Sequence, residues 1–148
     1  MRRWLLVILV ALLGLSQGVA AAQNEVLSLA YGRGVPKSVF WSSDGKSFVV
    51  VTGADTLWRY DGVTLAATAT LEDVTDASFT PNGKWLITQN SAKRFAVRSA
   101  ADPAQIVLDN FTNTSSSPGG RWLLTWSGDN RIALRSSKDP RQVVLQDA

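Results

Sequence analysis

The sequence contains neither cysteine nor histidine. Without cysteine the chain has no disulfide framework, zinc knuckle, iron–sulfur cluster or thiol nucleophile. Without histidine it lacks the commonest general base and the commonest metal ligand, so Ser-His-Asp and Cys-His sites are excluded. The 12 acidic residues could still form a carboxylate pair, but none lies in a motif that fixes a partner. No P-loop or dinucleotide-binding fingerprint occurs. We therefore expect a protein that is not an enzyme and binds no cofactor or metal.

The first 22 residues have the organisation of a secretory signal peptide. Arg2 and Arg3 precede an apolar run, Trp4–Leu15, which small residues follow at Ala20–Ala22. The run is 12 residues long, short of the roughly 20 that a membrane span needs. We expect cleavage after residue 22 and a periplasmic or secreted mature chain, 23–148. Membrane attachment would require that this segment stays uncleaved.

Charge does not point to nucleic acid. The chain carries 15 basic and 12 acidic residues, and two of the basic ones, Arg2 and Arg3, belong to the expected signal. The remainder is nearly balanced and forms no basic stripe, so no nucleic-acid partner is predicted.

An internal repeat of 37 residues is the strongest pattern in the chain. Pro81–Leu108 and Pro118–Leu145 share 14 of 28 residues at this offset. A weaker copy precedes them, because Trp41–Lys46 matches the sequence around Asn82-Gly83 at an offset of 38. Repeats are therefore expected at about 38–72, 76–109 and 113–146, in one domain.

The third part of the first copy aligns differently. Trp58 matches Phe95 at an offset of 37, and Ile132 at twice that offset. The first copy therefore has one extra residue between Trp41–Lys46 and Trp58, which predicts a bulge near Ser47. Trp58, Trp85 and Trp122 are expected in the core or in contacts between blades.

Each repeat reads as four short strands, here a to d, with Asp-Gly, Asn-Gly or Gly-Gly between a and b. Apolar runs without alternation predict b strands covered on both faces. Strands c alternate, with Phe95, Val97, Ile132 and Leu134 expected inward. The expected strands are a leading Val26–Leu29; a, Val39–Ser42, Ala77–Thr80 and Thr114–Ser117; b, Phe48–Val51, Trp85–Ile87 and Trp122–Leu124; c, Leu57–Tyr60, Arg94–Arg98 and Arg131–Arg135; d, Ala67–Leu71, Gln105–Leu108 and Gln142–Leu145.

The blocks Trp41-Ser42-Ser43-Asp44-Gly45-Lys46 and Phe79-Thr80-Pro81-Asn82-Gly83-Lys84 resemble the F-S-P-D-G-K turn of WD-repeat and TolB-type β-propellers. The resemblance implies an all-β fold of tandem four-stranded antiparallel blades. The family's Gly-His dipeptide is missing. Arg98 and Arg135 stand where the repeat alignment places the family's terminal aspartate, which Asp61 retains.

Three repeats are fewer than the four to eight blades of a closed propeller. The chain could complete a ring by self-association through its open blade edges, form part of a longer product, or remain an open stack.

Candidate binding residues lie in the loops d-to-a and b-to-c, which share one rim of a propeller. Such a rim could bind a protein partner or hold calcium through oxygen ligands, although plain turn solvation explains the same residues and no D-x-D-x-D-G pattern occurs. The repeated arginines of the c strands could line a face that meets an anionic ligand, but we expect them to cover blade surfaces with their stems and to pair locally with Asp102 or Asp139. These arginines are Arg94, Arg98, Arg131 and Arg135. The candidates for partner binding are Asp73, Asp76, Asn110, Asn113, Trp126, Asp129 and Arg131.

We therefore expect an exported, non-catalytic binding or scaffolding module that contacts another protein through its rim loops. A truncated or split piece of a larger propeller, without independent activity, is the alternative. An exported propeller-type hydrolase is a third reading, which the missing histidine disfavours.

Overall fold

The computed structural model describes residues 34–146. The predicted signal peptide (1–22) and the predicted leading strand (Val26–Leu29) lie outside these residues. The described part of the chain consists of strands and turns. It contains no helix of the length and apolarity that a membrane span requires.

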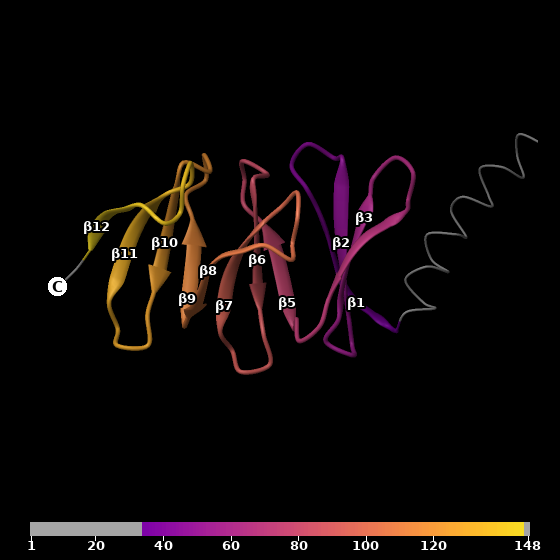
Figure 1. Cartoon of the computed structure of the whole chain (residues 1–148), viewed down its shortest axis with the longest axis horizontal. Helices are drawn as coiled ribbons and strands as arrows, with labels where there is room; N and C mark the ends of the chain where they lie inside the picture. Colours follow the sequence, from indigo (N-terminus) through magenta and orange to yellow (C-terminus); the bar gives the residue numbers. More distant parts are fainter. Residues whose placement is uncertain (1–33, 147–148) are drawn as a thin grey trace, which may run out of the picture. The chain divides into compact units, whose positions relative to one another are not determined.

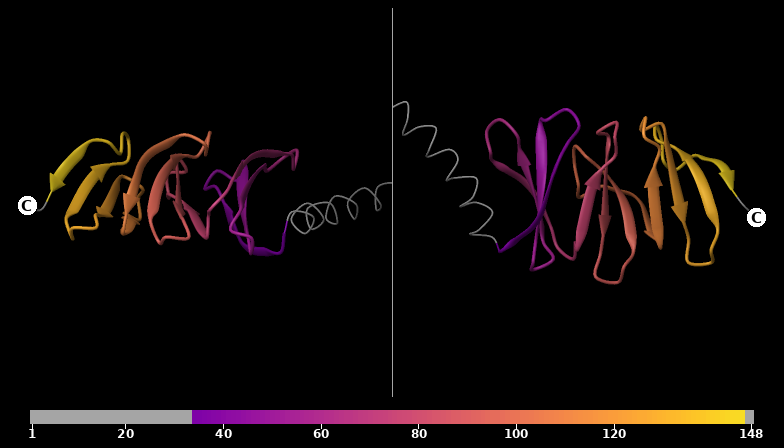
Figure 2. Two further views of the ribbon diagram at one scale, coloured as in Figure 1. Left: turned by 60° about the horizontal axis from the view of Figure 1, so that its bottom comes forward. Right: turned by 180° about the vertical axis from the view of Figure 1, so that it is seen from behind.

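Twelve strands form three four-stranded antiparallel sheets, each built from four consecutive strands. The three sheets lie side by side in chain order (Figures 1 and 2). The all-β prediction of tandem four-stranded units is confirmed. Sheet 1 contains β1 (Pro36–Trp41), β2 (Ser47–Thr52), β3 (Leu57–Asp61) and β4 (Ala67–Leu71); sheet 2 contains β5 (Asp76–Phe79), β6 (Trp85–Gln89), β7 (Phe95–Ser99) and β8 (Ile106–Phe111); sheet 3 contains β9 (Asn113–Ser116), β10 (Trp122–Trp126), β11 (Ile132–Ser136) and β12 (Val143–Gln146).

The turns between the first two strands of each sheet share the same backbone hydrogen bond. Gly45, Gly83 and Gly120 adopt positive φ angles of 68°, 69° and 64°, a region that favours glycine. In sheet 3 the amide of Gly120 donates to the carbonyl of Ser117, at 2.8 Å, and the hydroxyl of Ser117 accepts from the Trp122 amide, at 3.0 Å. Glycine at these positions thus sets the hairpin that brings each second strand back.

Consecutive sheets pack face to face through two apolar clusters. Between sheets 1 and 2, Leu86 packs with Val49, Val51 and Leu57, and all four side chains are fully buried. Between sheets 2 and 3, Leu123 packs with Ile87 and Val97. Because each sheet offers one face to each neighbour, the middle sheet is covered on both sides.

Hydrogen bonds also join sheet 2 to sheet 3 at their first turns. The indole Nε1 of Trp85 donates to the carbonyl of Ser137 at 2.7 Å. The side-chain Nδ2 of Asn82 donates to the carbonyl of Gly120 at 2.7 Å. A Cβ placed on Gly120 would lie 2.6 Å from the backbone nitrogen of Asn82, so these two turns are in direct contact.

The bulge predicted near Ser47 is wrong. Strand β2 pairs with β3 without a shift from Ser47 to Val51. Leu57, and not Trp58, occupies the position of Phe95 and Ile132, since each of these three residues makes the last pair between the second and third strands of its sheet. The first repeat becomes one residue shorter than the second only after the third strand. The amide of Asp61 donates to Ala66 O, whereas the equivalent amide of Ser99 donates to Gln105 O, one residue further along the chain.

The alternation predicted for the last repeat holds only in part. In β7 the inward residue Val97 is fully buried. In β11 it is Ala133 that is buried, at 7% exposed, whereas Ile132 and Leu134 are only partly buried. Ile132 and Leu134 lie on the face of sheet 3 that is turned away from sheet 2, so no described sheet covers them.

Candidate functional site

The loops between the second and third strands of each sheet meet the connections between sheets along one edge, the lower edge in Figure 1. We call this edge the loop rim, residues 53–56, 72–75, 90–94, 112 and 127–131. The amide of Val74 donates to Asp55 O at 2.7 Å, and the amide of Thr112 donates to Trp126 O at 2.8 Å. The two kinds of loop therefore share one rim, as the repeat predicts.

A threonine fixes each connection to the sheet that follows it. The hydroxyl of Thr75 donates to the carbonyls of Gln89, at 3.2 Å, and Asn90, at 3.3 Å. The hydroxyl of Thr112 makes the equivalent bonds to Trp126 and Ser127. These bonds hold the loop rim in the same geometry in sheets 2 and 3.

Two of the predicted residues, Asp73 and Asn110, come together in one recess. The recess has a volume of about 370 Å³ and lies against sheet 2, beside β7 and β8. Both residues are exposed and both adopt positive φ angles, 56° and 66°. Its lining combines positive and negative side chains: Asp73, Arg94, Arg98 and Asp109, with Thr88, Asn90, Phe95, Ala96, Ile106 and Asn110.

Asp73 is held in place by the neighbouring loop. Its Oδ1 accepts a hydrogen bond from the Ser91 amide at 3.0 Å. Hydrogen bonds from the side chain and backbone of Ser91 lower the pKa of Asp73 below its ordinary value of 3.8. The recess therefore presents an ionised carboxylate at neutral pH.

Arg98 also lines this recess and is held by two hydrogen bonds within the protein. Its Nε donates to the hydroxyl of Thr88 at 3.1 Å, and its Nη1 donates to the carbonyl of Pro103 at 2.9 Å. Burial lowers the pKa of Arg98, and the nearby Asp109 carboxylate raises it. The predicted pairing of Arg98 with Asp102 is wrong, because the guanidinium donates to the carbonyl of the next residue, Pro103, instead.

Arg135 repeats this arrangement in sheet 3. Its Nε donates to Thr125 at 3.0 Å and its Nη1 to Pro140 O at 3.1 Å, so the predicted pairing with Asp139 is wrong as well. Burial lowers the pKa of Arg135. These two arginines are structural clamps between strands rather than free binding groups.

Asp76 lies in a second recess, of about 360 Å³, with Lys37, Thr75, Gln89 and others. The exposed carboxylate of Asp76 accepts from the amide of Ala77 at 2.9 Å. The Nζ of Lys37 donates to Thr75 O at 2.8 Å, which links β1 to the connection before β5. The structure thus places Asp76 apart from the recess that holds Asp73.

Asn113 and Trp126 pair across β9 and β10 in sheet 3. The side-chain oxygen of Asn113 accepts from the Thr114 amide at 2.8 Å, and Trp126 is partly buried. This pair belongs to the rim of sheet 3, separate from the recess on sheet 2.

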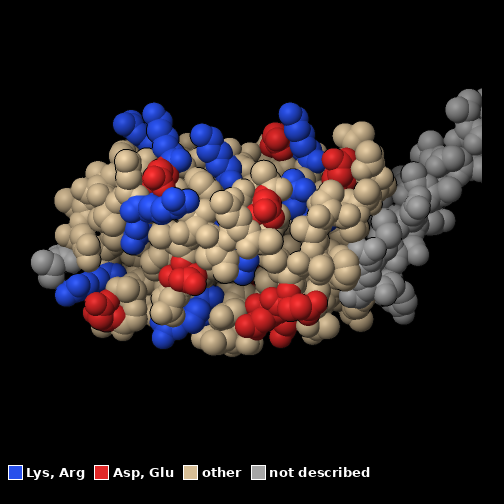
Figure 3. Space-filling model, in the orientation of Figure 1, with Lys and Arg blue, Asp and Glu red and all other residues tan. Residues whose placement is uncertain are grey.

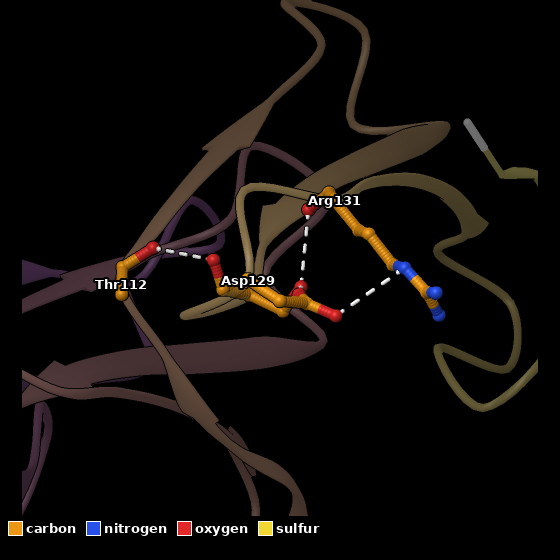
Figure 4. A network of polar contacts seen from close by, with 4 residues as sticks. Thr112, Asp129 and Arg131 are labelled. Atoms are coloured by element: carbon orange, nitrogen blue, oxygen red, sulfur yellow. Dashed lines mark hydrogen bonds and ion pairs between the residues drawn. The ribbon is translucent and has the colours of Figure 1, made fainter. Parts of the chain in front are cut away.

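Asp129 and Arg131 form an exposed ion pair on the loop between β10 and β11 (Figure 4). Arg131 Nε lies 3.3 Å from Asp129 Oδ2, with the two side chains 58% and 59% exposed. The hydroxyl of Ser127 donates to Asp129 Oδ1, which lowers the pKa of that carboxyl. Thr112 joins the network through Ser127 O at 3.2 Å. A pair this exposed contributes little to stability and leaves both charges available to a partner.

Acidic side chains gather at the lower right in Figure 3, at the end of the loop rim next to sheets 1 and 2. The acidic residues of the loops there are Asp55, Glu72 and Asp73. The hydroxyl of Thr56 donates to Glu72 Oε2 at 3.2 Å. Within residues 34–146 the structure shows no group of three acidic side chains close enough together to hold a metal ion.

Comparison with solved structures places the three sheets among known folds. The described sheets resemble those of U3-55K, at a TM-score of 0.53 and 12% identity over 74% of this chain. They also resemble the WD40 repeats of RRP9, at a TM-score of 0.53 and 12% identity over 73% of this chain. The fold is that of WD40-type propeller blades.

Because the sequence identity to these structures is only 12%, the similarity shows the fold alone. A third match, the hydrazine synthase of Kuenenia stuttgartiensis, has a TM-score of 0.51 and 16% identity over 75% of this chain. No family model matches the sequence. No curated protein matches it either.

The chain spans well under half the length of these matched structures, 38%, 37% and 35% of them respectively. Its three sheets therefore correspond to part of each matched chain.

Sequence reasoning missed three features of the loop rim and the two recesses. Lys37 and Asn90 belong to no motif, and only the fold brings them to the recesses. The paired threonines, Thr75 and Thr112, carry a signal that was available, since they are separated by the repeat length of 37 and precede the aligned block.

Proposed function

We propose that this chain is an exported, non-catalytic module of WD40-like blades that binds a protein partner through its loop rim. The observation that carries the proposal is the recess beside β7 and β8, where Asp73 and Arg94 of the loop rim lie together with Asn110 of β8. Loops positioned by a scaffold are where binding residues concentrate.

The chemistry of the recess favours a polar segment of a partner protein. Ionised Asp73 and the exposed Arg94 offer charges of both signs, and Asn110 offers an amide donor and acceptor. Phe95 and Ile106 supply apolar area beside them, and Ile106 is 48% exposed. Mixed charge with apolar surface suits a peptide backbone and its side chains better than a single small anion.

The acidic end of the rim adds a preference for a basic neighbour in the same partner. Asp73 lines the recess, and Asp55 and Glu72 lie on the adjoining loops of the rim, where these carboxylates attract a basic segment and repel an acidic one. This electrostatic term acts mainly on the rate of encounter and weakens with salt.

Position-specific photo-crosslinking in cells tests the proposal. A crosslinking residue at Asn110 should give a discrete protein adduct, which Asp73→Ala should weaken. The matched control is Val63, 85% exposed on a turn away from the loop rim, where the same adduct should be absent. Identical adducts from both positions, or none from Asn110, would refute rim binding.

Export rests on the order of residues 1–22 and is tested separately. A chain tagged at its C-terminus should appear in the periplasmic or secreted fraction, shortened by the signal. Val7→Arg interrupts the apolar run and should keep the full-length precursor inside the cell. Recovery of unprocessed wild type in the cytoplasm would contradict export.

A second candidate role is that of one section of a larger propeller. The observation that favours it is the extent of the structural matches, which cover 35–38% of each matched chain. We propose the hydrolase reading no further, because the likeness to hydrazine synthase concerns the fold and the chain lacks histidine.

A further inference from the structure

The face of sheet 3 turned away from sheet 2 is apolar and has no described sheet against it. Leu123 packs on sheet 2, so its neighbours along β10 point to the opposite side. Residues that pair directly across strands share a face of the sheet, so the pairing from β9 to β12 defines the rest of this surface. None of the described residues paired on it carries a charge. We call it the tail face: Trp122, Leu124, Trp126, Ile132, Leu134 and Leu145.

The equivalent face of sheet 2 is a packing surface within the chain. Five residues of the tail face have counterparts 37 positions earlier that lie in or against the cluster around Leu123: Trp85, Ile87, Phe95, Val97 and Leu108. At the sixth position sheet 2 has Gln89 where the tail face has Trp126, so the tail face is more apolar than the covered face that it repeats. Exposed apolar surfaces mark contacts with other molecules, and tryptophan is enriched at the centres of such contacts.

A projecting side chain and a recess lie next to each other on the tail face. Leu124, Ile132 and Leu134 line a recess of about 380 Å³. Leu145 lines the same recess and is 70% exposed, so its side chain stands out beside it. A two-fold contact places a surface patch against its own copy. In that arrangement the exposed leucine of each copy can enter the recess of the other, and no like charges meet across the face.

Sheet 1 does not offer a matching surface at the other end of the row of sheets. On its face turned away from sheet 2, Phe48 and Val50 are in register with Trp41 and Val39, and Tyr60 pairs with Phe48. Phe48, Val50 and Tyr60 are only 4%, 3% and 2% exposed, so this face is not available to a second copy. The tail face of one copy therefore has the tail face of another as its matching surface.

We infer that the tail faces of two copies pack on each other about a two-fold axis, with Leu145 of each copy in the recess of the other. Two sheets whose apolar side chains interdigitate at a spacing of about 10 Å form the core of a β-sandwich. Because both copies use the same surface, the contact closes at two chains and cannot grow into a filament. The dimer goes beyond rim binding and is independent of it, since the tail face contains no residue of the loop rim.

Light scattering on the full chain tests the inference. We expect about twice the mass of the single chain at high concentration and dissociation on dilution. Leu145→Glu places a charge without a partner in the contact and should raise the dissociation constant about 100-fold or more. Val63→Glu, at a site 85% exposed on a turn of sheet 1, should leave the dimer unchanged. A wild type that is monomeric at every concentration, or association that persists in folded Leu145→Glu, would overturn the proposal.

Disulfide trapping tests the two-fold geometry without a charge. The chain contains no cysteine, so a single introduced cysteine can form a disulfide only with a second copy. Under mild oxidation Leu145→Cys should give a covalent dimer much faster than the control Val63→Cys, and dilution below the dissociation constant should remove the difference. Equal rates at the two positions would overturn the tail-to-tail contact. Far-ultraviolet circular dichroism checks that each variant is folded. A failure of rim binding is read separately, from the Asn110 adduct.

Discussion

Replacing Gly120 by alanine should destabilise the protein far more than the same change at Gly45. Both residues have positive φ, so alanine costs about 1–2 kcal/mol at each for its backbone conformation alone. At Gly45 a new Cβ has nothing within 4 Å. At Gly120 it lies 2.6 Å from the backbone nitrogen and 3.3 Å from the Cα of Asn82. Backbone atoms cannot rotate aside, so the turns must separate.

That separation adds a second cost at Gly120 alone. Forcing a methyl group into a packed contact costs about 1–3 kcal/mol. The shift also strains the Asn82 Nδ2 bond to Gly120 O, which is 2.7 Å long. We therefore expect a loss of about 1–2 kcal/mol for Gly45→Ala and about 2–5 kcal/mol for Gly120→Ala.

Equilibrium urea denaturation of the two variants and the wild type measures this difference. Equal slopes with different midpoints would assign the effect to the folded state. Equal losses at the two glycines would refute the claim that the turn of sheet 3 rests on the turn of sheet 2.

Three further predictions follow from single contacts. Trp85→Phe removes the donor to Ser137 O and should cost about 1–2 kcal/mol more than Trp122→Phe in urea denaturation of the monomer; equal costs would contradict the inter-sheet bond. Arg98→Lys loses the planar fork to Thr88 and Pro103 and should cost about 1–3 kcal/mol by thermal melting, and a neutral result would exclude a clamp. Because the pKa of Asp73 is lowered in the folded protein, its ionised carboxylate stabilises the fold at pH values above the ordinary pKa of 3.8. This stabilisation is lost as the pH falls through the folded-state pKa of Asp73. Asp73→Asn should therefore flatten the acid limb of a stability–pH curve, and an unchanged limb would contradict the Ser91 contact.

Much of the fold could be predicted because the turn residues and the strand pattern agree. Asp44-Gly45 and Asn82-Gly83 specify tight hairpins, and each apolar run after them is a second strand. The repeat then implies that like sheets bury like faces, as Leu86 and Leu123 do.

The register of the third strand could not be predicted from side-chain likeness. Trp58 resembles Phe95 as an aromatic residue, yet Leu57 takes that position in the sheet. The tight loop before each third strand sets the register through positive φ at Asp55, Lys93 and Asn130. Lysine is no turn signal, so the sequence conceals this equivalence.

The candidate site was predictable only as a rim. Loop order places Asp73 and Asn110 on one edge, but their shared recess depends on the path of β8 and on the clamped Arg98. The hydrogen bonds of Arg98 and Arg135 to proline carbonyls also could not be predicted from the charged residues, because a backbone acceptor is not distinguished by the sequence.

Contacts between methyl groups of different sheets test the central claim, the face-to-face stacking of three like sheets, most directly. In a methyl-resolved nuclear Overhauser spectrum, Leu123 should show cross-peaks to Ile87 and Val97, and Leu86 should show them to Val49 and Val51. Packed apolar groups approach within about 4.5 Å, well inside the range of the measurement. Cross-peaks confined to residues of the same sheet would contradict the stacking.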